Sequence, residues 1–271
     1  MLYNARTYEK PRSIEEARRL LKQTDLKTLA LYDDLTTVDP ARRADIEAAV
    51  DLSALGLSGI DHKGTSLRIG ATTTLQDIAD ELGEAAGGLL ADCARQTAGW
   101  NVRHAATIGG LLTGGSVSAP LHLALDVLGA QVEITGQDGL LPLTSLSDEL
   151  AGEILLTVVI DLPDGSIGAA YEQVGRTPRD LPIVNTAAVV RLSEAGSASA
   201  RVSVGGVLDG HLLQLDLAGA NPDSLDQLID DLDGLLLDNP LGSTEYRQEM
   251  AAVLSRRVLL DARTQAGLSA A

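Results

Sequence analysis

The chain has 271 residues, of which 45% are hydrophobic and 2% are aromatic, and its formal charge at pH 7 is −17. This length is sufficient for more than one hydrophobic core, so we expect two or three subdomains with almost wholly aliphatic interiors. The strong negative charge argues against nucleic acid or an anionic membrane surface as a partner.

Cysteine and histidine usage points to an intracellular protein without a metal. Cys93 is the single cysteine and lies in an apolar stretch, so no internal disulfide is possible. The first residues lack the apolar core of a signal peptide, and no run reaches the roughly 20 apolar residues of a membrane span. We therefore predict a cytoplasmic protein. No metal site is predicted, because the four histidines have no short spacing; they are His62, His104, His122 and His211.

The N-terminal part of the chain alternates helix and strand signals. Residues 13–23 are predicted to form a helix, because Ser13 and Glu16 make a capping box ahead of an apolar face. Residues 27–32 then have the character of a short buried strand, and residues 48–52 of a strand end. These elements predict a small α/β subdomain over residues 1–56.

A second α/β subdomain is predicted over residues 57–165. Its expected strands are 66–70, 131–135 and 153–162. One expected helix is capped by Thr74, and two more span 85–98 and 119–128. Gln137-Asp138-Gly139 is a hairpin turn signal, and Pro163-Asp164-Gly165 marks the boundary turn.

Residues 166–271 change character. Strands near 168–175, 183–192 and 200–208 are joined by Gly/Ser turns, which predicts an antiparallel sheet, and helices are expected over 222–236 and 243–260. The fold class is therefore predicted to be α+β: two α/β subdomains followed by an antiparallel sheet with C-terminal helices.

One glycine-rich stretch stands out at residues 107–115. Thr107-Ile108-Gly109-Gly110 is predicted to end one element, and Gly114-Gly115 precedes a helix that opens near Pro120. Glycines let backbone amides turn toward a common point, and a helix N-terminus adds further donors, which together form a potential anion cradle. Gly-Gly pairs also close ordinary turns, and the residues alone favour that reading.

The residues from Trp100 to Ile134 resemble the second flavin-contacting loop of the FAD-binding medium subunit of molybdenum hydroxylases. This family includes xanthine dehydrogenase and aerobic carbon monoxide dehydrogenase. Within this stretch residues 102–110 match closely, residues 67–75 and 201–207 match outside it, and a weaker likeness covers most of the chain. The resemblance implies a fold of the FAD-binding, vanillyl-alcohol-oxidase-like type and FAD as cofactor. It also implies two partners, an iron–sulfur subunit and a molybdopterin subunit.

Several positions depart from the family pattern. The family's Leu-Ala-Gly-Gly-Thr-Asp-Leu loop, whose glycine amides wrap the FAD pyrophosphate, corresponds to residues 29–35, where Leu31, Tyr32 and Asp33 replace the two glycines and the threonine. Large side chains block the approach of phosphate to backbone, and Asp33 adds a repelling charge. Pro120 stands where the family has an Asp, and Glu172 where it often has a Lys. Reduced or lost FAD binding is therefore predicted.

The leading hypothesis is a medium subunit with a structural or assembly role in a molybdenum hydroxylase complex, without catalytic residues of its own. One alternative is a working FAD subunit that passes electrons from iron–sulfur clusters to an external acceptor. Another is a binding module for a different small ligand. If FAD binds, the predicted contacts are Thr107, Ile108, Gly109, Gly110, Gly114 and Gly115.

Overall fold

The computed structural model describes residues 5–22, 27–33, 46–146, 150, 152–162, 166–177, 180–193, 195–230 and 236–268. The predicted boundary turn at 163–165 lies outside these residues. The chain divides into two compact units, each built from three segments. The first unit comprises Met1–Ile78, Trp100–Gly115 and Ala130–Asp161, and the second comprises Ala79–Gly99, Ser116–Gly129 and Leu162–Ala271.

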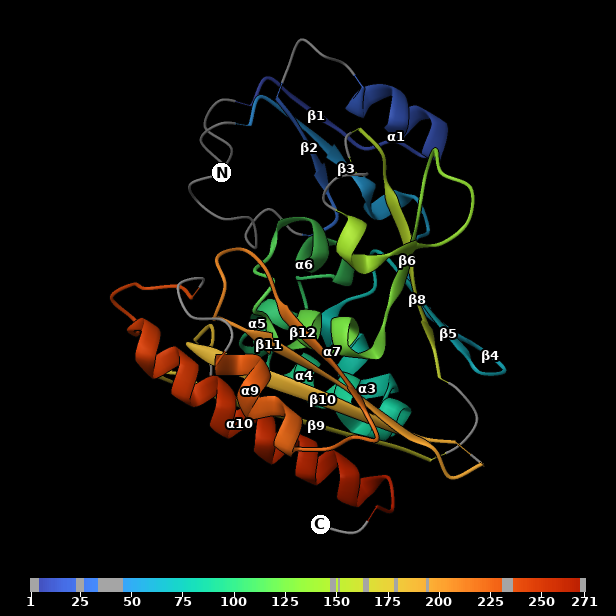
Figure 1. Cartoon of the computed structure of the whole chain (residues 1–271). Coiled ribbons are helices and arrows are strands. Elements are labelled where there is room, and N and C mark those ends of the chain that lie inside the picture. Colours follow the sequence, from blue (N-terminus) through green and yellow to red (C-terminus); the bar gives the residue numbers. More distant parts are fainter. Residues whose placement is uncertain are drawn as a thin grey trace. The chain divides into compact units, whose positions relative to one another are not determined.

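The elements confirm the predicted α+β class (Figure 1). Within the described ranges they form three separate sheets of three, five and four strands. Each predicted segment, 1–56, 57–165 and 166–271, contains one complete sheet. The exact boundaries of these segments stay a prediction.

The first unit begins with a small parallel sheet. Its strands are β1 (Thr7–Glu9), β2 (Thr28–Leu31) and β3 (Ala48–Asp51), with β3 in the centre. Helix α1 (Ile14–Leu21) connects β1 to β2, and the Ser13 side chain accepts a hydrogen bond from the backbone N–H of Glu16, as predicted. The carboxyl ends of the three parallel strands lie at one edge of this sheet.

The second sheet of this unit is antiparallel, in the order β4-β5-β8-β6-β7. Its strands are β4 (Ile60–Lys63), β5 (Ser66–Gly70), β6 (Gln131–Ile134), β7 (Leu141–Pro142) and β8 (Leu155–Asp161). β6 and β7 pair as a hairpin around the predicted turn. The helical elements of this unit are η1 (Leu52–Ala54), α5 (Trp100–Arg103), α6 (Ile108–Gly114) and η3 (Leu143–Ser145), and α3 (Leu75–Glu81) begins in it.

The second unit is organised around the four-stranded antiparallel sheet β12-β11-β10-β9. Its strands are β9 (Ser166–Val174), β10 (Val184–Leu192), β11 (Ala198–Gly205) and β12 (Leu213–Ala218). Its helices are η2 (Ala85–Gly88), α4 (Leu89–Gln96), α7 (Pro120–Leu128), α9 (Asp223–Asp230) and α10 (Thr244–Gln265). Strand β12 was not predicted from the sequence.

Helices cover both faces of this sheet (Figure 1). α9 and α10 pack on one face over a core that includes Val190 and Val202, and α7 packs on the other. On the α7 side, Asp126 accepts hydrogen bonds from the Ser203 hydroxyl at 2.6 Å and from Gln214 Nε2 at 2.5 Å. Because helices cover both faces, β10 is buried along most of its length, and the buried stretch includes Asn185 and Thr186.

A charged cluster joins α1 to the segment before β8 in the first unit. Arg18 Nε lies 2.8 Å from Glu153 Oε2, and Lys22 and the Thr135 hydroxyl also contact the Glu153 carboxylate. The hydrogen bond from Arg18, followed by those from Lys22 and Thr135, outweighs the effect of burial and lowers the pKa of Glu153 to about 2. The carboxylate therefore stabilises the fold only while it is ionised.

Replacing Glu153 with Gln is expected to lower the free energy of unfolding at pH 7 by about 1 kcal/mol, since Arg18 and Lys22 are partly exposed and water weakens their pairing. The wild-type advantage is present above the ordinary pKa of 4.5 and shrinks as the pH falls toward about 2, because a depressed pKa makes protonation favour the unfolded state. Urea unfolding of both proteins over this range measures the difference. Asp138→Asn, at an exposed turn, is the control, and a difference independent of pH would contradict the assignment.

Candidate functional site

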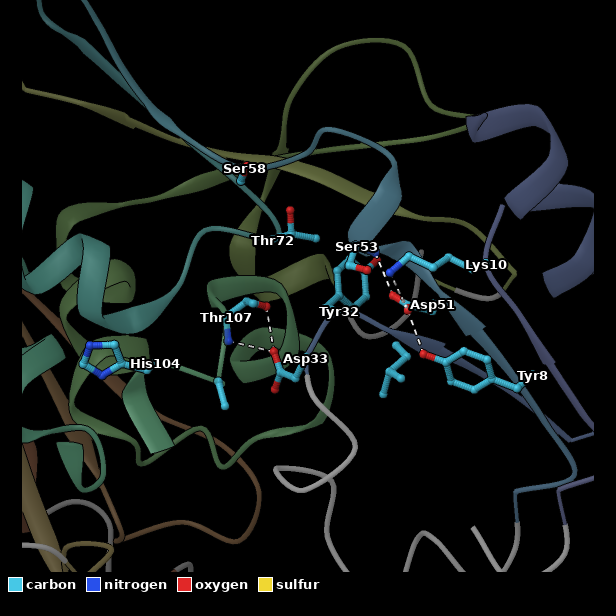
Figure 2. A pocket seen from close by; sticks show the side chains of 12 residues that line it. Tyr8, Lys10, Tyr32, Asp33, Asp51, Ser53, Ser58, Thr72, His104 and Thr107 are labelled. Atoms are coloured by element: carbon cyan, nitrogen blue, oxygen red, sulfur yellow. Dashed lines mark hydrogen bonds and ion pairs between the residues drawn. The ribbon is translucent and has the colours of Figure 1, made fainter. Parts of the chain in front are cut away.

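The carboxyl edge of the parallel sheet gathers most of the polar side chains of the candidate site. Lys10 follows β1, Asp33 follows β2 and Asp51 ends β3, so three strands deliver charged groups to one edge. In open sheets with parallel strands, this edge is where ligands bind. Tyr8 and Tyr32 stand beside these charges (Figure 2).

Tyr32 is buried and fixed at both ends of its side chain. Its hydroxyl oxygen accepts a hydrogen bond of 2.7 Å from the backbone N–H of Leu155, and burial raises the pKa of the phenol. Its ring packs against Gly109 so closely that a Cβ at that glycine would lie 2.6 Å from the ring. Tyr32 therefore fills the space beside Gly109 in the folded chain.

Asp33 binds directly to the start of helix α6. Its Oδ1 accepts hydrogen bonds from both the backbone N–H and the hydroxyl of Thr107, each at 2.7 Å (Figure 2). A Cβ on Gly110 would lie 2.0 Å from the same carboxylate oxygen. Because Gly110 has no side chain, the Asp33 carboxylate can occupy this space.

The prediction that residues 107–110 end an element is wrong. Thr107 is the N-cap of α6, and its hydroxyl accepts a hydrogen bond from the N–H of Gly110 at 3.1 Å. The N–H groups of Ile108 and Gly109 donate to the carbonyl oxygens of Thr73 and Ala71. The first N–H groups of a helix have no acceptor within the helix itself. In α6 these N–H groups donate to acceptors elsewhere in the chain, so they are satisfied.

The other glycines of the predicted cradle lie at the far end of α6. Gly114 is the last residue of the helix, and the N–H of Gly115 donates to the Leu111 carbonyl at 2.9 Å. Within the first unit, the structure brings Thr107, Gly109 and Gly110 next to Tyr32 and Asp33, whereas Gly114 and Gly115 close the helix.

A cavity of about 610 Å³ opens at this edge of the sheet. Its wall comes from β1, β2 and β3, from residues 10, 32 and 33 just after β1 and β2, and from residues 53, 58, 72, 104, 105 and 107. This volume lies within the roughly 300–1,000 Å³ typical of small-molecule sites. All of the lining residues belong to the first unit.

Asp51 forms a second fixed carboxylate in the cavity wall, which the sequence analysis missed. Tyr8 donates its hydroxyl to Asp51 Oδ2 at 2.7 Å, the Lys10 ammonium lies 3.2 Å from the same oxygen, and the Ser53 N–H donates to Oδ1 at 2.9 Å. Burial tends to raise the pKa of Asp51, but the hydrogen bonds from Ser53, Tyr8 and Lys10 together lower it. The position of Asp51 at a predicted strand end was the available signal.

The remaining positions singled out from the sequence belong to the second unit. Pro120 is the first residue of α7, in agreement with the predicted helix start. Glu172 Oε1 lies 2.9 Å from Arg257 Nη1, so this carboxylate has a cation partner in its own unit. Burial lowers the pKa of His122 to about 4, which leaves its imidazole neutral at pH 7.

In the described ranges, no three His, Cys, Asp or Glu side chains are grouped in a way that could hold a metal ion. None of the helices within these ranges combines the length and apolar character needed to cross a membrane.

Comparison with known families gives a match over the first three fifths of the chain. Residues 3–159 match the family described as the FAD binding domain in molybdopterin dehydrogenase. The carbon monoxide dehydrogenase medium chain of Afipia carboxidovorans is 28% identical over 280 residues, which cover 96% of this chain and 97% of the relative. The 6-hydroxypseudooxynicotine dehydrogenase complex subunit alpha of Paenarthrobacter nicotinovorans is 29% identical, with 92% of each chain covered.

Solved structures show the same fold along the whole chain. A chain of the cyanide-inactivated Cu,Mo-CO dehydrogenase superposes with a TM-score of 0.84 at 25% identity, covering 98% of this chain and all of the other. A chain of quinoline 2-oxidoreductase from Pseudomonas putida 86 gives a TM-score of 0.81 at 22% identity, with 98% and 99% coverage, and shows the fold alone.

Replacing Gly110 with Ala is expected to destabilise the wild-type protein by about 2 kcal/mol or more, because the new Cβ collides with the Asp33 carboxylate. The same replacement in an Asp33→Gly background is expected to cost little, because the colliding group is gone. Urea unfolding of the four proteins of this double-mutant cycle measures the coupling, expected at about 1–3 kcal/mol. Gly99→Ala is the control, since nothing lies within 4 Å of a Cβ there. Equal costs of Gly110→Ala in both backgrounds would contradict the described contact.

Proposed function

Because this chain belongs to the family of FAD-binding domains in molybdopterin dehydrogenases, we propose that it is a medium subunit whose role is structural and whose FAD binding is reduced or lost. The single observation that carries the proposal is the Asp33 carboxylate, which takes both donors of Thr107. The residues present at the first loop do not fit a pyrophosphate.

The misfit has an electrostatic and a steric part. A pyrophosphate close to Thr107 would meet the Asp33 carboxylate, and each pair of like unit charges 4 Å apart costs about 4 kcal/mol at an effective dielectric constant near 20. The Tyr32 ring lies against Gly109, so the backbone there is covered by a side chain. Each charge-assisted hydrogen bond that the phosphate loses is worth a further ~1.5–3 kcal/mol.

The proposed partners follow from the relatives. One relative is named as a medium chain and the other as a subunit of a dehydrogenase complex, and each is matched over more than nine tenths of its length. We infer that this chain assembles in the cytoplasm with an iron–sulfur subunit and a molybdopterin subunit. In such a complex, this chain holds its partners in place, and the redox chemistry belongs to the other subunits.

The second candidate function is that of a working FAD subunit, which passes electrons from iron–sulfur clusters to an external acceptor. The observation in its favour is the cavity of about 610 Å³ that remains beside Thr107. This function requires Asp33 to leave Thr107 and Tyr32 to leave Gly109, so that the backbone donors reach the cofactor. Thr107, Ile108, Gly109, Gly110, Gly114 and Gly115 remain the proposed contacts for that case.

The decisive comparison is FAD binding by the wild-type chain and by the triple variant Leu31→Gly, Tyr32→Gly, Asp33→Thr, which introduces the residues of the family loop. The wild type is expected to show no saturable binding. The variant is expected to bind FAD with saturation, because one unfavourable charge contact and two steric obstacles are removed. Quenching of flavin fluorescence during titration of the full chain measures both affinities.

The control is Asp138→Thr, which removes the same charge at an exposed turn of the first unit. It should leave FAD binding at the wild-type level. Circular dichroism of the triple variant checks that it is folded, and Asp33→Thr alone provides a less disruptive version. Tight, stoichiometric binding of FAD by the wild type would overturn the proposed structural role.

A further inference from the structure

We propose that the cavity at the carboxyl edge of β1, β2 and β3 binds an uncharged ligand with a flat ring and hydroxyl groups, of the nucleoside class. We further propose that it discriminates against the phosphorylated form of the same ligand. This inference rests on the proposed function, because it takes the donors of Thr107 to be occupied by Asp33. The cavity volume of about 610 Å³ is sufficient for a ligand of this size.

The charges in the wall disfavour an anion. Among the described Lys, Arg, Asp and Glu residues that line the cavity, Lys10 carries one positive charge and Asp33 and Asp51 carry two negative charges, a net charge of −1. The Lys10 ammonium is already paired with Asp51 at 3.2 Å. The chain as a whole carries −17, so the surrounding potential adds to the repulsion of a phosphate.

A cation gains little from the same wall, because both carboxylates already have strong donors. Asp33 accepts two hydrogen bonds from Thr107, and Asp51 accepts from Tyr8, Lys10 and Ser53. A bound cation would displace these donors and leave buried or half-buried polar groups without hydrogen bonds. The free-energy cost of those lost hydrogen bonds exceeds the stabilisation that an exposed ion pair provides. The wall therefore favours a ligand without a net charge.

Two hydroxyl groups on the wall are available to such a ligand. The side chains of Ser58 and Thr72 line the cavity (Figure 2), and within the described part of the chain neither hydroxyl has a hydrogen-bond partner. The neighbouring Thr73 differs, because its hydroxyl accepts from the Gly59 N–H at 2.9 Å and donates to the Gly59 carbonyl at 3.1 Å. A hydroxyl donates and accepts at once, so sugar-like hydroxyls suit Ser58 and Thr72.

Tyr8 provides a surface for a ring. Its side chain is 53% exposed although it belongs to the cavity wall, and its hydroxyl is held by Asp51 at 2.7 Å. An aromatic ring fixed at its polar end offers a flat apolar face at little further entropy cost. An aromatic base or a flavin-like ring can stack on this face, and Ser58 and Thr72 line the same cavity for hydroxyl groups of the ligand.

The test is isothermal titration of the full chain with adenosine, adenosine monophosphate, riboflavin and riboflavin monophosphate. At least one of the two neutral compounds is expected to bind with saturation, and its phosphorylated form is expected to bind at least tenfold more weakly. Asp33→Thr should narrow this ratio, because the repelling carboxylate is removed. The absence of binding by both neutral compounds, or equal binding of a compound and its phosphate, would overturn the inference.

Matched variants locate the binding. The pair Ser58→Ala, Thr72→Val is expected to weaken binding of the neutral compound about tenfold, as for the loss of two neutral hydrogen bonds. Thr144→Val, at an exposed position of the same unit, should leave it unchanged. If the pair has no effect, the binding site lies elsewhere and the proposal fails. The FAD titration separates the two proposals. If the neutral compounds do not bind and FAD does not bind either, this inference fails but the structural role stands. Tight FAD binding overturns both proposals.

Discussion

The two hydrogen bonds from Thr107 to a single oxygen of Asp33 are the interaction on which the candidate site depends. They fix the residue after β2 to the residue that begins α6, across 74 positions of sequence. The same contact places the carboxylate directly over Gly110, and the preceding residue, Tyr32, lies against Gly109. The absence of side chains at Gly109 and Gly110 therefore makes room for Tyr32 and Asp33.

An internal carboxylate changes what the site can bind. A helix start with free N–H groups attracts external anions, but here the donors of residues 107–110 all have partners inside the chain. An intramolecular anion needs no loss of translational freedom to bind, so it competes well against a ligand in solution. In the proposed structural role, this fixed contact takes the place of phosphate recognition. The cavity then keeps a net charge of −1 from Lys10, Asp33 and Asp51, together with the hydroxyl groups of Ser58 and Thr72.

Local signals in the sequence predicted the elements that frame this site. The capping box at Ser13, the alternating strand before Gly70 and the proline at the start of α7 all have local physical causes, and all three elements occur. The departures at Leu31, Tyr32 and Asp33 predict a changed phosphate loop, and this stays a prediction. These predictions needed only propensity, periodicity and the family pattern.

The parts that were missed depend on contacts between distant residues. No local rule indicates that Asp33 reaches Thr107, or that Tyr8, Lys10 and Asp51 meet at one sheet edge. The glycine pair at 109–110 has the composition of a turn, and it becomes the start of a helix because residues 71–73 supply acceptors for its N–H groups. Tertiary contacts override local preference at these positions.

The central claim is that this subunit does its work without a bound flavin. The most direct measurement is the flavin content of the complex purified from its native host with this chain tagged, after desalting and acid precipitation. Flavin released into the supernatant is quantified by fluorescence against the amount of this chain. The account predicts a flavin content far below one per chain, together with co-purifying molybdenum and iron. One FAD per chain that survives desalting would contradict it.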